Sequence, residues 1–229
     1  MLINHRRAFW YAMLLLGSLL FVLWAVGRHP PIVAPRTTLP FVGVFDQRMY
    51  DFMDTIRISP LTWSFRFLNV VGGGLVTIPL RAIASIYLLA RRWWRRAAAF
   101  MLTWAVSELL LTFLKSWFHR GRPPGGLVDV LGYSFPSGHA TAGAATAVAL
   151  VLAFIPPGPK RRKWEWIAVA FSFVMAMSRV YLHAHWFSDV VAGVLLGAGI
   201  ALGCAAISTE FATLTLRRKV DQPVPVTEG

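Results

Sequence analysis

Six long apolar runs decide what this chain can fold into. They cover residues 8–27, 67–90, 97–114, 139–155, 164–181 and 190–207. Each is close to the roughly 20 residues that a helix needs to cross about 30 Å of hydrocarbon. Hydrophobic residues make up 56% of the 229-residue chain and charged residues only 14%, which is too apolar for one water-soluble core. The sequence therefore predicts an all-α fold, a six-transmembrane-helix bundle.

The basic residues form short clusters between these runs. Thirteen of the 23 Lys and Arg residues lie in four clusters, at 6–7, 91–96, 160–163 and 217–219. Short cytoplasmic loops collect Lys and Arg, so we predict a multi-pass protein of the cell (inner or plasma) membrane with both termini cytoplasmic. The net charge of +13 forms no continuous basic face, and we expect no nucleic-acid partner.

This layout predicts one membrane-embedded domain, residues 1–216, followed by a cytoplasmic tail, 217–229, that we expect to be disordered. The first run also fits a cleaved signal peptide, although it is longer than the 7 to 15 residues of a typical signal-peptide core, and this alternative stays open. A single cysteine, Cys204, excludes an intramolecular disulfide framework.

Residues 45–56 have apolar side chains near one helical face. They predict an interfacial amphipathic helix between spans one and two, but a loop helix packed on the bundle fits the same pattern. Two charged residues lie within the apolar runs. We expect Arg81 to snorkel to the cytoplasmic side, and Glu108 to make an interhelical hydrogen bond or to be a protonated buried acid.

Polar residues gather at three ends of the apolar runs, at 115–123, 136–139 and 178–189, and the topology places all three on the non-cytoplasmic side. Lys115, Arg122 and Arg179 bring three cations to this side. Each contributes about 4 kcal/mol at 4 Å from a phosphate oxygen, at an effective dielectric constant of about 20 and before desolvation. Any one of them fits an ordinary interfacial cation, but together they indicate a site for a ligand with two or more negative charges.

The stretch 136–139 reads as the start of a helix. Ser137 is the expected N-cap, and the backbone N–H groups of a helix start bind anions. Gly138 lets the backbone approach an oxyanion closely, and His139 then stands on the first turn. Taken alone, the same pattern is also typical of a cap with no ligand.

His185 and Asp189 are four residues apart, so they share one helical face if the sixth helix begins early. The carboxylate can then hold one ring nitrogen and leave the other as a nucleophile. A purely structural His–Asp pair is the alternative for such a spacing. Metal ligation by His183, His185 and Asp189 is a further alternative. The cations nearby would repel a metal ion, and we expect neither a metal nor another cofactor.

In order along the chain, these motifs resemble the three-part signature of the type 2 phosphatidic acid phosphatase superfamily, in its integral-membrane lipid phosphatase branch. The matching positions are Lys115 with Arg122 and Pro123, then Pro136 to His139, then Ser178 and Arg179 with His185 and Asp189. The resemblance implies that His185 attacks phosphorus and that Asp189 orients it. It also implies that His139 protonates the leaving oxygen, and that the phosphoryl oxygens are held by Lys115, Arg122, Ser137, Gly138 and Arg179.

The resemblance leads us to predict metal-independent dephosphorylation of a lipid phosphate or diphosphate at the outer membrane face, through a phosphohistidine. Undecaprenyl diphosphate and phosphatidylglycerol phosphate are the leading candidate substrates. Arg120, His119 and Arg36 are candidates for holding a second phosphate. A non-hydrolytic carrier or flippase for phosphorylated lipids remains as the alternative function, and in either case the partners are membrane lipids.

Overall fold

A computed structural model of the chain describes residues 5–27 and 40–220, and its regular elements in these ranges are helices. In chain order they are α1 (His5–Val26), α2 (Pro40–Thr55), α3 (Ser59–Val71), α4 (Gly74–Ala90), α5 (Trp94–Phe118), α6 (Gly138–Phe154), α7 (Pro159–Tyr181) and α8 (Phe187–Val220). The all-α fold class is confirmed for the described residues.

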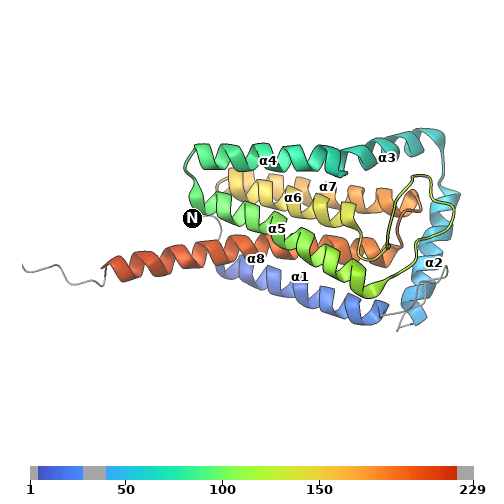
Figure 1. Cartoon of the computed structure of the whole chain (residues 1–229), viewed down its shortest axis with the longest axis horizontal. Helices are drawn as coiled ribbons and strands as arrows, with labels where there is room; N and C mark the ends of the chain where they lie inside the picture. The colour runs from blue at the N-terminus through green and yellow to red at the C-terminus, as the bar shows by residue number, and fades with distance from the viewer. Residues whose placement is uncertain (1–4, 28–39, 221–229) are drawn as a thin grey trace, which may run out of the picture.

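Helix α8 lies at the centre of the bundle, where α1, α5, α6 and α7 pack around it (Figure 1). Glycines allow its backbone to lie very close to α6. A Cβ atom added at Gly193 would lie 2.7 Å from the carbonyl oxygen of Ser137, and one at Gly197 would lie 2.8 Å from the backbone nitrogen of Ala145. Small residues at a helix interface permit this kind of packing in membranes. The start of α6 is therefore held against the start of α8.

Among the described residues, three helices are long and apolar enough to cross a membrane by themselves, over Arg7–Val26, Trp94–Phe118 and Phe187–Thr209. A fourth crossing is formed if α3 and α4 count as one span, with a bend of 45° between them. The bend replaces the continuous second run that we predicted, because three consecutive glycines, residues 72–74, interrupt the helix. Helix α6 is apolar but has only 17 residues, and α7 begins with a basic cluster, so the six-span layout stays a prediction.

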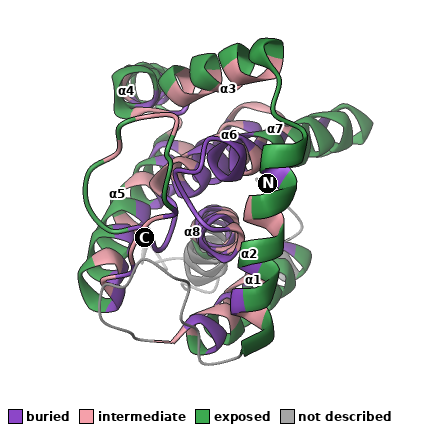
Figure 2. Cartoon of the chain, turned by 90° about the vertical axis from the view of Figure 1, so that its right-hand side faces the viewer, coloured by how far each residue is buried: buried purple, intermediate pink, exposed green. Residues whose placement is uncertain are grey.

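The two ends of the bundle differ. Helix α2 lies across the end where the segment between α5 and α6 and the turn between α7 and α8 are found (Figure 1). The turns between α4 and α5 and between α6 and α7, which carry two of the basic clusters, lie at the opposite end. Viewed onto the α2 end, buried residues gather at the starts of α6 and α8 (Figure 2). The predicted polar stretches therefore share one end of the molecule, away from two basic clusters.

Three expectations about individual segments need correction. Helix α2 begins at Pro40, before the predicted residue 45, and its placement at a membrane interface stays a prediction. Helix α8 continues to Val220, so residues 217–220 of the predicted disordered tail are helical, while 221–229 lie outside the described residues.

The third correction concerns Arg81, which does not snorkel. Its side chain is only 2% exposed and points into the bundle, where it binds Glu108 at 2.8 Å and the Thr146 hydroxyl at 2.7 Å. A charge within a span is stabilised better by such partners than by stretching to a distant interface. The interhelical interaction expected for Glu108 is present as this ion pair.

Candidate active site

The three polar stretches meet at the α2 end of the bundle. Lys115 lies near the end of α5, Arg122 in the following loop, Ser137 to His139 at the start of α6, Arg179 near the end of α7, and His185 and Asp189 around the start of α8. A backbone hydrogen bond joins two of the stretches, because the Ser137 N–H donates to the Asp189 carbonyl at 3.0 Å. The site is therefore assembled from segments far apart in the sequence.

The His185 ring is buried between a carboxylate and a guanidinium. Its Nδ1 lies 3.6 Å from Oδ2 of Asp189, within ion-pair range but longer than a hydrogen bond. Its Nε2 lies 3.2 Å from Nη1 of Arg122. The ring thus directs Nδ1 to the anion and Nε2 to the cationic side of the site.

The spacing suggested that His185 and Asp189 share a helical face, but the structure brings them together in another way. Helix α8 begins at Phe187, so His185 lies in the turn before it. The Asp189 side chain folds back over this turn and accepts the Trp186 N–H at 2.9 Å. The turn, rather than a helical face, brings the two side chains together.

Burial lowers the pKa of His185 to about 3. Asp189 opposes this change, whereas the positive charges of Arg122 and Arg179 add to it. The ring is consequently neutral at physiological pH and can act as a nucleophile through a nitrogen that carries no proton.

Lys115 and Arg122 share one acceptor, the carbonyl oxygen of Tyr133. Nζ of Lys115 donates to it at 2.5 Å and Nη2 of Arg122 at 3.1 Å. Arg122 also donates to the carbonyls of Gly132 at 3.0 Å and Ala184 at 2.6 Å. Both cations thus fasten the loop between α5 and α6 to the site, and a bound phosphate would compete with these carbonyls for the same N–H groups.

Arg179 is fully buried and only partly paired. One of its nitrogens, Nη1, donates to the side-chain oxygen of Asn69. Its Nε and Nη2 are buried with no hydrogen-bond partner among the described residues. Buried donors of a charged group are rarely left unpaired, so these atoms are suited to bind the oxygens of an anionic ligand.

His139 is held by the same residue as Arg179. Its Nε2 lies 3.0 Å from the backbone carbonyl of Asn69, and since a carbonyl can only accept, Nε2 carries a proton. Nδ1 is then the nitrogen left for a proton transfer. Asn69 therefore links the two residues, on α6 and α7, to the end of α3.

The start of α6 agrees with the sequence expectation. Ser137 is the N-cap, and its side chain accepts the Ala140 N–H at 3.5 Å. A Cβ added at Gly138 would meet only Leu111, at an ordinary contact distance of 3.5 Å. Packing alone does not require glycine there, which is consistent with close approach of a ligand to this backbone.

Comparison with known protein families now adds to this geometry. A model of the PAP2 superfamily matches residues 96–212, which is half of the chain and contains all three predicted motifs, from Lys115 to Asp189. The chain belongs to the PAP2 superfamily. Membership of this superfamily, together with the apolar helices, identifies the chain as a membrane phosphatase.

Relatives of this PAP2 protein agree in sequence and in fold. An undecaprenyl-diphosphatase of Sulfolobus acidocaldarius is 27% identical over 185 residues, covering 78% of this chain and 84% of the relative. The crystal structure of a transmembrane PAP2-type phosphatidylglycerolphosphate phosphatase from Bacillus subtilis has a TM-score of 0.74 at 23% identity, covering 88% of this chain and 97% of that one. The crystal structure of LpxE from Aquifex aeolicus has a TM-score of 0.56 at 24% identity, covering 72% of this chain and 94% of that one. These two structures support the PAP2 fold.

Four residues around the PAP2 motifs were missed as site residues by sequence reasoning. Asn69 binds His139 and Arg179, and the Ser134 hydroxyl donates to Oδ2 of Asp189. Asp46 and Arg120 lie behind Asp189, where Arg120 binds both carboxylates. Among these four, only Arg120 drew notice in the sequence, as a candidate for a second phosphate. Its guanidinium is instead buried and donates to two carboxylates, so it does not serve that role.

The remaining candidates face elsewhere. The His183 ring stacks on Tyr50 of α2 at 3.8 Å between centroids and bonds to Arg57, so it does not join His185 and Asp189 in a ligand set. Within 5–27 and 40–220, no three His, Cys, Asp or Glu side chains are grouped as metal ligands would be. The His119 ring packs edge-on against Tyr133, and Arg36 lies outside the described residues.

Proposed function

We propose that this PAP2 protein hydrolyses a lipid phosphate or diphosphate at the outer face of the cell membrane, without a metal ion, through a phosphohistidine. One observation carries the proposal: a neutral, buried His185 lies between the carboxylate of Asp189 and the guanidinium of Arg122. A carrier that only binds the headgroup would need the cations but not this oriented imidazole.

In the first step, Nε2 of His185 attacks phosphorus while the bond from phosphorus to the leaving oxygen breaks. His139, as a cationic imidazolium, gives the proton on its Nδ1 to that oxygen and is left neutral. The charge on the phosphoryl oxygens is held by Lys115, Arg122 and Arg179 together with the backbone at Ser137 and Gly138. Positioning and charge stabilisation supply most of the catalysis in phosphoryl transfer, and three fixed cations provide the stabilisation that a metal ion supplies elsewhere.

In the second step, water attacks the phosphohistidine and the phosphorus–nitrogen bond breaks. His139, now neutral, takes a proton from this water. The products are inorganic phosphate and the dephosphorylated lipid, and His185 regains its neutral state. The same residue thus acts first as an acid and then as a base, as general acid–base catalysis requires in a two-step displacement.

The relatives direct the choice of substrate. Undecaprenyl diphosphate and phosphatidylglycerol phosphate are the two candidates, because an undecaprenyl-diphosphatase and a phosphatidylglycerolphosphate phosphatase are among the similar proteins. In both lipids the phosphate belongs to a polar headgroup that is anchored by long apolar chains, so the phosphate can reach the site while the apolar part remains in the bilayer. A single domain with six spans and both termini in the cytoplasm would place the α2 end outside.

The decisive experiment measures phosphate release by purified protein on three lipids side by side: polyprenyl diphosphate, phosphatidylglycerol phosphate and phosphatidate. We expect the wild-type protein to release phosphate and to do so equally well in excess EDTA. His185→Ala should be inactive while its elution volume and melting temperature in detergent remain those of the wild type. Binding of these lipids without phosphate release over hours would favour a carrier, and loss of activity in EDTA would indicate a metal-dependent reaction.

A further inference from the structure

A buried chain of three charges lies behind the candidate nucleophile. The Arg120 guanidinium, 7% exposed, donates through Nη1 to Oδ1 of Asp189 at 2.5 Å and through Nη2 to Oδ2 of Asp46 at 2.7 Å. Asp189 is fully buried and Asp46 is 1% exposed. The order is thus His185, Asp189, Arg120, Asp46, and it runs from the turn before α8 to the middle of α2.

The contacts leave Asp189 little freedom. Arg120 occupies its Oδ1, while its Oδ2 accepts from the Ser134 hydroxyl and the Trp186 N–H. The carboxylate cannot rotate without losing several buried hydrogen bonds, each of which is costly to leave unmade. Oδ2 is therefore held on the side of the His185 ring.

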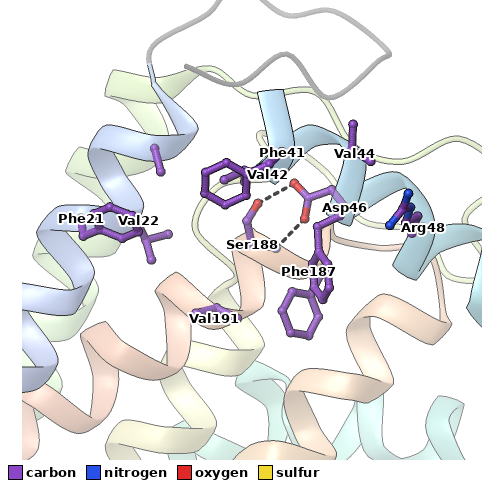
Figure 3. A pocket seen from close by; sticks show the side chains of 12 residues that line it. Phe21, Val22, Phe41, Val42, Val44, Asp46, Arg48, Phe187, Ser188 and Val191 are labelled. Carbon is purple, nitrogen blue, oxygen red and sulfur yellow. Dashed lines mark hydrogen bonds between the residues drawn. The ribbon is translucent and has the colours of Figure 1, made fainter. Parts of the chain in front are cut away.

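Asp46 is held just as firmly. Its Oδ1 accepts the Ser188 N–H and its Oδ2 the Ser188 hydroxyl, both at 2.7 Å (Figure 3). It also borders a cavity of about 510 Å³ that is lined mainly by apolar side chains of α1, α2 and α8. Burial raises the pKa of Asp46 and Arg120 opposes this, so the ionised carboxylate is kept there at a cost.

The sum of the charges gives a reason for that cost. When Nε2 of His185 bonds to phosphorus, the ring becomes cationic and needs a negative neighbour. Asp189 paired with Arg120 alone would be neutral overall and would offer the ring little stabilisation. Asp46 adds a second carboxylate, so the group of three carries a net charge of −1 next to the ring.

We propose that Asp46 and Arg120 are positioning residues for the phosphoryl transfer: Arg120 fixes the Asp189 carboxylate, and Asp46 restores the net negative charge that Arg120 would otherwise cancel. The inference rests on the proposed role of His185 as nucleophile. It also gives α2 a function, because this helix brings the second carboxylate to the site.

The test compares Asp46→Asn with a matched control, Asp51→Asn, which removes the same charge from an exposed position of α2. Asp46→Asn retains the shape of the side chain but removes its charge. We expect kcat to fall roughly 10- to 100-fold, because a small misplacement of a reacting group costs up to about 100-fold, with KM within about twofold. Asp51→Asn should match the wild type in both constants.

A double variant separates charge from structure. Asp46→Asn with Arg120→Gln returns a net charge of −1 to Asp189 and leaves two neutral amides in place of the ion pair. We expect its kcat to exceed that of Asp46→Asn at least about fivefold, although it carries one more substitution. A contact that only anchored α2 would give no such recovery.

The following results decide between a positioning role and a purely structural one. The inference is overturned if Asp46→Asn has the same kcat as Asp51→Asn. It is also overturned if the kcat of the double variant does not exceed that of Asp46→Asn. The melting temperature in detergent shows whether Asp46→Asn folds. If it does not fold, the kcat of the double variant decides: a value within about tenfold of wild type supports the inference, and any lower value overturns it. Activity retained by His185→Ala overturns the proposed function instead.

Discussion

The two histidines of the site are supported in different ways. His185 is 2% exposed and lies at the end of a row of buried charges, Asp189, Arg120 and Asp46. His139 is partly exposed, on the first turn of α6, and Nε2 bonds to a neutral group, the backbone carbonyl of Asn69.

The difference matches the two chemical tasks that we propose for these residues. A nucleophile must remain neutral and fixed before the reaction, and its positive charge must be stabilised afterwards, which a buried anion does well. An acid and base must exchange protons with the leaving oxygen and with water, so it needs partial exposure. A neutral partner orients His139 without adding a negative charge that would hold its proton.

The largest effect is expected where the charge next to His185 is removed. Asp189→Asn should lower kcat by about 10³- to 10⁴-fold, because the amide cannot stabilise a cationic ring and leaves Arg120 with one carboxylate. Single-turnover measurement of the lipid product, which leaves in the first step, would show this loss. A decrease below tenfold would show that His185 does not depend on a charged partner.

The loss of activity on removing the proposed acid, His139, should depend on the leaving group of the substrate. His139→Ala should lower kcat by roughly 10²- to 10⁴-fold on a lipid phosphate, whose alkoxide leaves poorly without a proton. The loss should be much smaller in the first step with p-nitrophenyl phosphate, whose leaving group needs no proton. Burst kinetics on both substrates would measure it, and equal losses would contradict the assignment of His139 as the acid.

Loss of the neutral side-chain support of Arg179 should matter less than loss of the charged support of His185. Asn69→Ala removes the side-chain acceptor of Arg179 but retains the backbone carbonyl that binds His139. We expect KM to rise roughly tenfold with kcat less affected, because the loss falls on a residue that holds phosphate. Steady-state kinetics would separate the two constants. A fall in kcat as large as that of Asp189→Asn would remove the contrast between the two supports.

The smallest effect is expected when the pH is lowered, because kcat/KM should not follow the titration of an ordinary histidine. A histidine nucleophile of ordinary pKa would lose half its kcat/KM near pH 6.5 on acidification, as the ring becomes protonated. The pKa of His185 is lowered to about 3 by burial, so the ring stays neutral as the pH falls from 8 to 5. A profile of kcat/KM against pH should therefore show no loss of activity with a midpoint near pH 6.5 on the acid side.

Much of the site follows from local sequence. The cations and the Pro136-to-His139 cap were identified because each depends on residue type and spacing along one helix end. Arg81 and Arg120 were misread for the same reason: an apolar run suggests snorkelling and a basic motif suggests phosphate. Their actual partners, Glu108 and Asp46, come from other helices.

The sequence by itself determined most of the helices and the candidate site residues, because apolar periodicity and side-chain type act over short distances along the chain. Only the tertiary structure decided which charges are paired and which are left for a ligand. Asp46 and Arg120 are separated by 74 positions, yet their side chains meet at 2.7 Å. No local pattern specifies such a contact, since it depends on how α2 packs across the starts of α6 and α8.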